Sequence, residues 1–375
     1  MRITEIETRL IRLSAEAWFP DGIVPQNSIP YWDFPLVTVH TDEGIEGYTM
    51  GYAPLGQGKA NFHSIHDVFY YDLVGKNPLD TQAIWQTIRF KNRHLYILSE
   101  AFYAELDIAL WDIKGKKANM PIAELLGKMR DKVPLYMTSP PVQLQDLEAV
   151  KNQGKLCLSR KYAGWKLQLT GSPDIEIPKL QLARHVVGKG FPLMLDCSGV
   201  YSYLNALKIG RALDELEYEW FEEPIPDKDI EHLKKLTANL KTPVLAAETA
   251  SLFDLPQYVN NGAVDILRGD THLKGGITGM IKTLGFCEIH GYELEIHTAA
   301  SPILDLANLQ IGCTTHLSKF LEAHHPMFRF GLIGDPLDVK EDGCQHLPSG
   351  PGLGANIDWD WMDNHTIDKL KGCTY

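Results

Sequence analysis

Short apolar runs recur along the middle of the chain, and stretches with helical periodicity fill the intervals between them. Neighbouring runs start about 20 to 30 residues apart, which is the length of one strand followed by one helix. Eight runs can be placed, the last less clearly, at 133–137, 164–169, 192–196, 218–222, 244–248, 263–267, 292–297 and 316–322. They predict a (β/α)8 barrel, with an open doubly wound sheet as the structural alternative. The sequence has no G-x-G-x-x-G or Walker A motif to support that alternative.

The first third of the chain has a different pattern. Residues 1–60 alternate apolar and polar positions in short segments separated by turns, whereas 62–127 has helical periodicity. A segment rich in proline and aromatic residues, 18–33, is typical of a long surface loop. We therefore predict an N-terminal α+β domain at 1–130, a barrel domain at 131–345 and a C-terminal segment at 346–375.

Composition narrows the classes of function. The 375 residues include 36 basic and 48 acidic side chains, and the net charge of −12 disfavours nucleic acid or a membrane surface as partner. No apolar stretch of about 18 residues predicts a transmembrane helix, and the first twelve residues lack the apolar region of a signal peptide. The six scattered cysteines form no C-x-x-C pair. We expect a cytoplasmic protein with reduced thiols.

Three carboxylates come at the ends of successive predicted strands. Asp196, Glu222 and Glu248 follow one another at intervals of 26 residues, which predicts equal depth at the carboxyl end of a barrel. Three carboxylates that converge cannot all ionise without a cation, and oxygen ligands favour a hard ion. We expect Mg²⁺ at this position. The alternative is that each carboxylate is a solvated residue at the end of its strand.

Lys166 and Gln168 share one face of the second barrel strand, and alternation directs both into the barrel. A lysine that is partly desolvated near a metal should have a lowered pKa, which suits a general base. The alternative is a lysine that only pairs with a carboxylate of the metal site.

Two further strand ends carry Asp270 and His297, and Glu322 closes the ring on the last strand. A carboxylate that accepts a hydrogen bond from one imidazole nitrogen orients the ring, so the other nitrogen can act as acid or base. Glu322 would bind the carboxylate of a substrate through a hydrogen bond, or it is an ordinary solvated glutamate.

Together these residues resemble the enolase superfamily in its mandelate racemase branch. The resemblance spans nearly the whole chain. It rests on Asp196, Trp220-Phe-Glu-Glu-Pro224, Glu248, Asp270 with Gly275-Gly-Ile-Thr278, His297, Ala109-Leu-Trp-Asp-Ile-Lys-Gly115 and Pro351-Gly-Leu-Gly354.

The resemblance implies one Mg²⁺ per subunit, held by Asp196, Glu222 and Glu248, and a small-molecule carboxylate as substrate. A base would remove the proton α to that carboxylate, and the metal would stabilise the enediolate. It also implies that the N-terminal domain, completed by the C-terminal segment, caps the barrel, and that the chain forms a homo-oligomer. Two loops would then cover the substrate, one at 18–33, which includes Trp18, and one at 48–59.

The sequence departs from the family pattern at several positions. The second strand usually carries Lys-x-Lys, whereas here Gln168 stands where the usual base would be. Lys166 is then either a base or a residue that only binds the substrate carboxylate. Ser198 stands where asparagine is common, and Lys274 is one position out of step with the lysine of the lactonising branch.

With one acid–base pair, Asp270 and His297, the simplest reaction is elimination. Loss of a hydroxyl from a sugar acid gives a 2-keto-3-deoxy acid, the reaction of a dehydratase, whereas opening the ring of an anhydro-sugar acid is that of a cycloisomerase. A racemase or epimerase is a second alternative, and the carboxylate triad disfavours a binding protein without activity. The substrate is expected to be hydroxylated rather than aryl, as indicated by the polar and aromatic residues Trp18, Tyr31, Trp32, His63 and His66. The candidate substrate-binding residues are Gln168, Ser198, Glu322 and Trp18.

Overall fold

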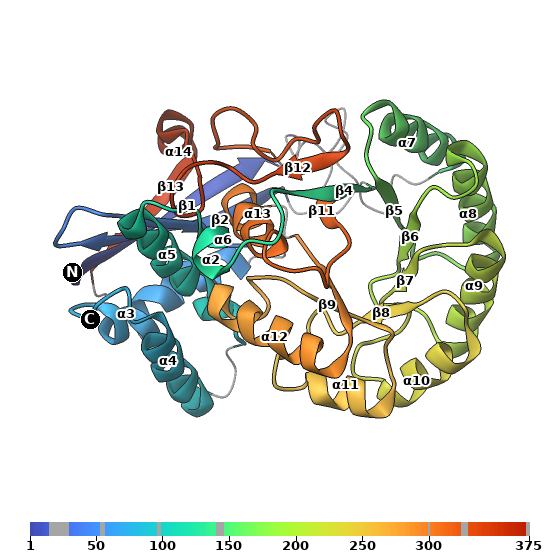
Figure 1. Cartoon of the computed structure of the whole chain (residues 1–375), viewed down its shortest axis with the longest axis horizontal. Helices are drawn as coiled ribbons and strands as arrows, with labels where there is room; N and C mark the ends of the chain where they lie inside the picture. Colours follow the sequence, from blue (N-terminus) through green and yellow to red (C-terminus); the bar gives the residue numbers. More distant parts are fainter. Residues whose placement is uncertain are drawn as a thin grey trace.

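A closed barrel of eight parallel strands lies beside a smaller antiparallel sheet with its own helices (Figure 1). The computed structural model describes residues 1–14, 30–52, 57–95, 99–139, 146–298, 301–323 and 329–372. The closed barrel and the separate antiparallel sheet confirm the predicted α/β fold class, with a barrel and an N-terminal α+β domain.

The barrel strands follow chain order, and the last strand pairs with the first to close the ring. In the described part of the chain, one helix lies between each barrel strand and the next. The strands are β4 (Lys132–Thr138), β5 (Gly164–Gln168), β6 (Leu193–Asp196), β7 (Trp220–Glu222), β8 (Val244–Ala246), β9 (Ile266–Gly269), β10 (Glu293–Ile296) and β11 (Leu321–Ala323). The helices are α7 (Leu147–Ser159), α8 (Pro173–Val187), α9 (Tyr203–Leu216), α10 (Ile230–Asn239), α11 (Leu255–Asn261), α12 (Gly276–His290) and α13 (Pro302–Gly312).

Successive side chains along the barrel strands point alternately outward and inward, so they form two apolar layers, one under the helices and one inside the barrel. Outward-facing side chains such as Leu167, Leu195 and Phe221 are buried in the large core under the surrounding helices. Inward-facing aromatic side chains, among them Tyr136, Trp220 and Phe320, fill the barrel from within. The interior is therefore packed with side chains, and polar chemistry is confined to the carboxyl ends of the strands.

The N-terminal sheet has the strand order β13-β1-β2-β3, so the last strand of the chain pairs with the first (Figure 1). Its strands are β1 (Ile3–Ser14), β2 (Tyr31–Thr41), β3 (Gly47–Met50) and β13 (Thr366–Lys371). The other helices are α2 (Gln57–Ser64), η3 (Ile65–Phe69), α3 (Tyr70–Leu73), α4 (Thr81–Leu95), α5 (Ala101–Ala118), α6 (Ile122–Leu126) and α14 (Trp359–His365). Strand β12 (Cys344–His346) pairs antiparallel with β4 of the barrel instead. The C-terminal segment thus completes the cap, as the resemblance implied.

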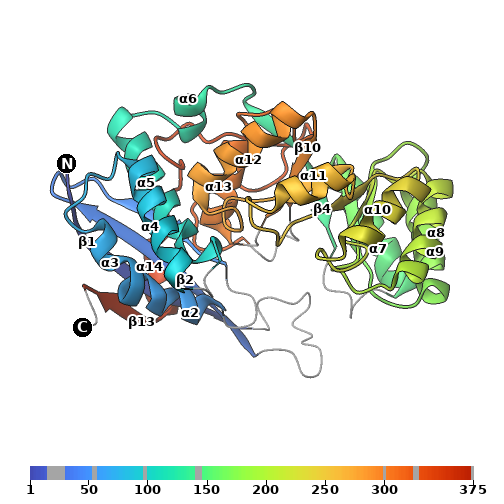
Figure 2. The same cartoon turned by 90° about the horizontal axis from the view of Figure 1, so that it is seen from below.

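Helix α5 joins the cap to the barrel by packing against α12 (Figures 1 and 2). Trp111 donates from Nε1 to Thr278 Oγ1 over 2.9 Å, and Asp107 Oδ2 accepts from the Thr278 backbone N–H over 2.8 Å. Trp85 donates to the Gly275 carbonyl over 2.7 Å. Because these groups are buried, their directed bonds fix the orientation of the cap over the carboxyl ends of the barrel strands.

Some expectations for the cap need correction. Trp18 and most of the 18–33 segment lie outside the described residues, while Tyr31 and Trp32 begin strand β2. His66 does not face a substrate site, because its ring bonds to Thr8 Oγ1 and to the Gly372 carbonyl inside the cap. His66 therefore links β1 to the residue that follows β13 through its two ring nitrogens.

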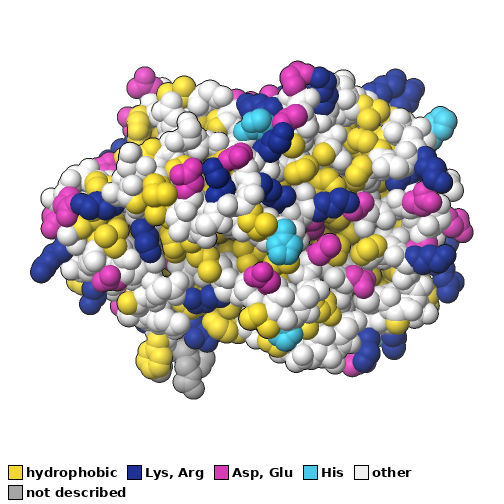
Figure 3. Space-filling model, in the orientation of Figure 1, with side chains coloured by type: hydrophobic (Ala, Val, Ile, Leu, Met, Phe, Trp, Pro, Cys, Tyr) yellow, Lys and Arg dark blue, Asp and Glu magenta, His cyan; other side chains and the backbone are white. Residues whose placement is uncertain are grey.

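The surface carries both signs of charge. Basic and acidic side chains are interspersed on the face shown in Figure 3, in keeping with the modest net charge. Within the described ranges, no helix is long and apolar enough to cross a membrane.

Asp107 makes the stability of the cap–barrel junction depend on pH. Burial raises the pKa of its carboxyl to about 7, above the ordinary value of 3.8. The folded state then holds a proton more tightly than the unfolded chain, so stability falls as pH rises from about 4 to about 7. We predict that Asp107→Asn lessens this fall by about 1 to 3 kcal/mol, measured by chemical unfolding at pH 5 and pH 7.5.

The exposed Asp174, which pairs with Lys208 at the surface, provides the control. Asp174→Asn should leave the pH dependence of unfolding unchanged. Equal pH slopes for wild type and Asp107→Asn would contradict the role of Asp107.

Candidate active site

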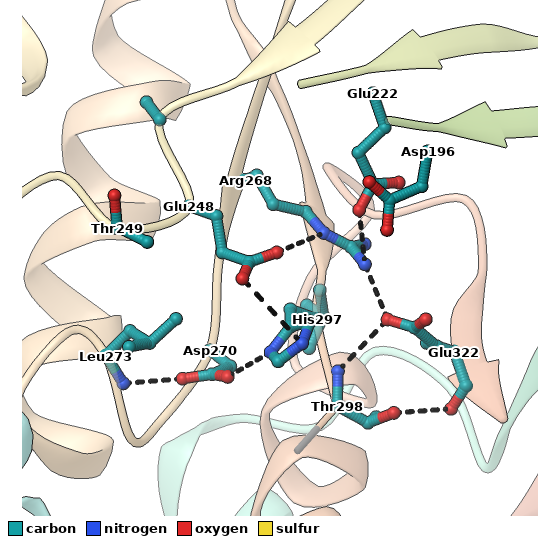
Figure 4. Close-up of polar contacts among 12 residues, drawn as sticks. Asp196, Glu222, Glu248, Thr249, Arg268, Asp270, Leu273, His297, Thr298 and Glu322 are labelled. Atoms are coloured by element: carbon teal, nitrogen blue, oxygen red, sulfur yellow. Dashed lines mark hydrogen bonds and ion pairs between the residues drawn. The ribbon is translucent and has the colours of Figure 1, made fainter. Parts of the chain in front are cut away.

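The three predicted carboxylates lie at the carboxyl ends of adjacent strands (Figure 4). Asp196 and Glu222 are the last residues of β6 and β7 and are direct partners in the register of the sheet. Glu248 does not share their depth: Leu245 is the register partner of Glu222, and Glu248 lies three residues further along. Glu222 is therefore 1% exposed in its side chain, whereas Glu248 is 19% exposed at the rim.

Lys166 lies among these carboxylates. Its Nζ is 2.8 Å from Glu222 Oε1, 2.9 Å from Glu322 Oε1 and 3.9 Å from Asp196 Oδ2. Burial and Arg268 lower the pKa of Lys166, but Glu222 and Glu322 outweigh them and hold this pKa well above its usual range. The expectation of a lowered pKa is thus wrong for this arrangement, because the lysine has two close carboxylate partners.

Arg268 is a second buried cation at this end of the barrel, and its side chain is fully buried (Figure 4). Its Nη2 is 3.0 Å from Glu222 Oε1 and 2.5 Å from Glu322 Oε2, and its Nε is 3.6 Å from Glu248 Oε2. Nη1 donates to the Tyr136 hydroxyl over 2.9 Å. The planar guanidinium therefore links carboxylates from three strands.

Sequence reasoning missed Arg268, although a signal was present. The apolar run was read as ending at Leu267, yet Ile266, Arg268 and Asp270 alternate on one face of the same strand. An arginine that shares a strand face with a predicted catalytic aspartate points into the barrel, so strict alternation would have identified it.

Two further predicted residues contact Asp196. Gln168 donates from Nε2 to Asp196 Oδ2 over 3.1 Å, and the backbone N–H of Ser198 donates to Asp196 Oδ1 over 2.8 Å. These bonds fix the orientation of the carboxylate. Gln168 and Ser198 therefore lie beside the candidate metal ligand, within the site where the sequence placed them.

His297 and Asp270 form a buried pair across the ends of β10 and β9 (Figure 4). His297 Nδ1 donates to Asp270 Oδ2 over 2.5 Å, and the Leu273 backbone N–H donates to Asp270 Oδ1 over 2.6 Å. His297 Nε2 lies 3.9 Å from Glu248 Oε1. Burial lowers the pKa of His297, but Glu248 and Asp270 outweigh it and raise the pKa to about 9. The geometry thus gives an oriented imidazole whose Nε2 is directed toward the carboxylates.

Glu322 contributes to the charge balance of the same site. Its Oε1 accepts from Thr138 Oγ1 over 2.5 Å, and its Oε2 accepts from the Thr298 backbone N–H over 3.3 Å, in addition to the two cations. Its side chain is 1% exposed. Trp18, the remaining predicted residue, lies outside the described part of the chain.

The chemistry of the donor set fits a hard divalent cation. Burial and the charges of Glu248, Asp227, Asp196 and Glu222 raise the pKa of Glu223 to about 11, and Glu223 Oε1 is buried without a hydrogen-bond partner among the described residues. The carboxylates of Asp196, Glu222, Glu248 and Glu322 share two close cations among the described residues, Lys166 and Arg268, so negative charge exceeds positive charge at the site. Within the described ranges no three acidic, histidine or cysteine side chains already form a metal cage, because Glu222 is turned toward Lys166 and Arg268.

Comparisons with known proteins agree with this architecture. Residues 27–127 match the model of the mandelate racemase/muconate lactonizing enzyme N-terminal domain, and residues 146–361 match that of the enolase C-terminal domain-like family. The chain belongs to the mandelate racemase/muconate lactonizing enzyme group of the enolase superfamily. The resemblance seen in the sequence is thereby confirmed.

Individual relatives share the chain almost end to end. An arabinonate dehydratase of Saccharolobus solfataricus is 31% identical over 329 residues, which cover 85% of this chain and 87% of that protein. A D-galactarolactone cycloisomerase of Agrobacterium fabrum is 25% identical over 96% of this chain and 97% of its own length. The crystal structure of a D-glucarate dehydratase from Agrobacterium tumefaciens complexed with magnesium is 27% identical, covers 98% of this chain and 100% of that one, and has a TM-score of 0.86. The relatives are enzymes, and so is this member of their superfamily.

Arg268 should stabilise the folded protein through its buried ion pairs. Arg268→Met leaves Glu222 and Glu322 without one of their two cations, and removal of one partner from a buried pair costs about 3 to 5 kcal/mol. Chemical unfolding measures this loss. The double variant Arg268→Met/Glu322→Gln should recover part of it, because it also removes a carboxylate charge.

Arg211, which is exposed on α9, serves as the control, and Arg211→Met should leave stability within about 0.5 kcal/mol of wild type. An equally small effect of Arg268→Met would contradict the charge balance described for the site.

Proposed function

We propose that this enzyme is a Mg²⁺-dependent dehydratase of a sugar acid. Support comes from one arrangement in particular: the His297–Asp270 pair faces a set of carboxylates. Gln168, which is not ionisable, occupies the position of the usual base, and Lys166 lies between Glu222 and Glu322. A single acid–base group suits elimination better than a two-base racemisation.

In this proposal Asp196, Glu222 and Glu248 hold the ion, one per subunit. Mg²⁺, when bound, would neutralise negative charge that develops on the substrate carboxylate. The solved D-glucarate dehydratase complexed with magnesium supports the choice of metal. The side chains of Glu222 and Glu248 would have to leave their present cation partners to reach the ion.

His297 would act first as base, once the charge of bound Mg²⁺ offsets the carboxylates that raise its pKa to about 9, and then as acid. Its Nε2 removes the proton from the carbon next to the substrate carboxylate, and Asp270 stabilises the imidazolium that results. The electron pair of the broken C–H bond forms a carbon–carbon double bond while the bond to the β-hydroxyl breaks. His297 returns its proton to the departing hydroxyl as water, and the enol product becomes a 2-keto-3-deoxy acid.

The other residues would bind the substrate. Lys166 would hold its carboxylate rather than remove a proton, because Glu322 would keep the ammonium group charged after Glu222 turns to the ion. Gln168, Ser198, Glu322 and Trp18 remain candidates for contacts to substrate oxygens. Assembly as a homo-oligomer and a cytoplasmic location, with no nucleic acid or membrane partner, stay part of the proposal.

A cycloisomerase is the second candidate. The same proton removal would expel a ring oxygen instead of a hydroxyl, and the D-galactarolactone cycloisomerase matches nearly the full chain at 25% identity. A racemase or epimerase is a third candidate, since an N-succinyl-Arg/Lys racemase is also 25% identical.

A panel of aldonic, aldaric and anhydro-sugar acids, incubated with enzyme and Mg²⁺, tests the proposal. A dehydratase should form a 2-keto-3-deoxy acid from one hydroxylated member, detected by a 2-keto acid assay, and EDTA should abolish the signal. Product from an anhydro acid alone would support the cycloisomerase. Deuterium uptake at the α-carbon without elimination would support the racemase, and no reaction with any member would contradict all three.

Substitution of His297 separates acid–base chemistry from metal binding. His297→Asn should lower kcat by at least about 100-fold while Mg²⁺ affinity changes little, because an amide cannot carry the proton. Titration calorimetry and the product assay measure the two quantities. Turnover at the wild-type rate would remove His297 from the mechanism.

Lys166→Met is the companion variant. Weaker substrate binding with α-proton exchange retained would agree with a lysine that holds the substrate carboxylate. Loss of exchange would instead make Lys166 a base.

A further inference from the structure

The turn after β8 presents Glu248 to the site and has an unusual backbone. The strand ends at Ala246, and Ala247 follows with φ of +75°, a conformation that costs a non-glycine residue energy. Glu248 then extends toward Arg268 and His297, while Thr249 lies on the other side of the turn (Figure 4). Something outside the turn must hold this backbone in place.

Lys274 contacts the turn from one side. Its Nζ donates to three backbone carbonyls, those of Ala247 over 2.9 Å, Glu248 over 2.8 Å and Ala250 over 2.6 Å. An ammonium group has three N–H donors, and here each has one carbonyl partner. Lys274 is also fully buried, so this side chain is committed to the turn rather than to solvent or to the substrate site.

Asp227 contacts the same turn from the other side. Its Oδ1 accepts from the Ala247 backbone N–H over 3.0 Å, and its Oδ2 accepts from the Thr249 backbone N–H over 3.2 Å and from Thr249 Oγ1 over 3.0 Å. The cation therefore binds carbonyls and the anion binds amides, so the two side chains fix both faces of one short peptide segment.

A glycine on the neighbouring strand makes room for the lysine. A Cβ atom on Gly269 would lie 2.5 Å from Lys274 Cε, which is closer than real Cβ atoms come, and 3.1 Å from its Cγ, which is a tight contact. Gly269 ends β9, directly before Asp270. The path of the Lys274 side chain past this strand thus requires a residue without a side chain.

We propose that Lys274 and Asp227 are positioning residues that set the backbone of the Ala247–Ala250 turn so that Glu248 can bind the metal ion. This inference rests on the proposed function, since it assumes that Glu248 is a metal ligand. The positioning role also explains why Lys274 is out of step with the lysine of the lactonising branch. The Lys274 side chain points to the turn behind Glu248. Neither residue touches the reacting atoms.

Mg²⁺ affinity without substrate is the measurement that tests this role. Lys274→Met and Asp227→Asn each leave all proposed ligands in place, yet should weaken Mg²⁺ binding about 10- to 100-fold, as loss of supporting contacts does at other metal sites. Gly269→Ala should have the same effect by displacing Lys274 without removing its charge. Titration calorimetry measures the affinity, and circular dichroism in EDTA verifies that each variant is folded.

Two reference variants make the outcome specific. Thr278 is on α12, the helix that follows Lys274, and it accepts a buried hydrogen bond from Trp111. Thr278→Val removes this bond, so it should destabilise the protein yet leave Mg²⁺ affinity within about twofold. Glu222→Gln removes a proposed ligand and should weaken binding directly. If wild type binds no Mg²⁺, the proposed function itself fails.

If wild type binds Mg²⁺ and Glu222→Gln weakens it, but folded Lys274→Met and Asp227→Asn bind like wild type, only the positioning role is overturned. Should Lys274→Met not fold, Asp227→Asn and Gly269→Ala decide the question alone.

Discussion

Carboxylates gather at one end of this barrel, and the cost of placing like charges together is the constraint on which the site depends. Asp196, Glu222 and Glu322 come from three strands of one sheet and Glu248 from the turn after a fourth, so their proximity follows from the fold. Lys166 and Arg268 pair with the inner members, at distances from 2.5 to 3.0 Å for the close contacts. Four carboxylates thus share two close cations among the described residues, so the balance remains negative. That imbalance favours a divalent cation as the missing partner.

The same charges govern which side chain can perform acid–base chemistry. Lys166 is enclosed by glutamates and Gln168 cannot ionise, whereas His297 is oriented by Asp270 at the edge of the carboxylate set. One competent imidazole agrees with elimination. Buried hydrogen bonds from α5 attach the cap to the barrel. The elements from which the substrate-covering loops are expected to extend are therefore held in a fixed position relative to the barrel.

Much of this architecture could be predicted from the sequence because barrel strands are buried on both faces and therefore read as apolar runs. The pairing of Asp270 with His297 followed from strand ends alone. Two features could not be predicted in this way. The position of Glu248 depends on the left-handed conformation of Ala247, and the pKa of Lys166 depends on partners from strands far away in the chain. Arg268 was missed because the apolar run was taken to end at Leu267, one residue before it.

A crystal structure with Mg²⁺ and a hydroxamate analogue of the sugar acid tests the central claim most directly, because it locates the ion and the α-carbon together. We predict one Mg²⁺ bound by Asp196, Glu222 and Glu248, with the atom that stands for the α-carbon about 3 to 3.5 Å from His297 Nε2. An ion held elsewhere, or an α-carbon that lies next to Lys166 and out of reach of His297, would contradict the account.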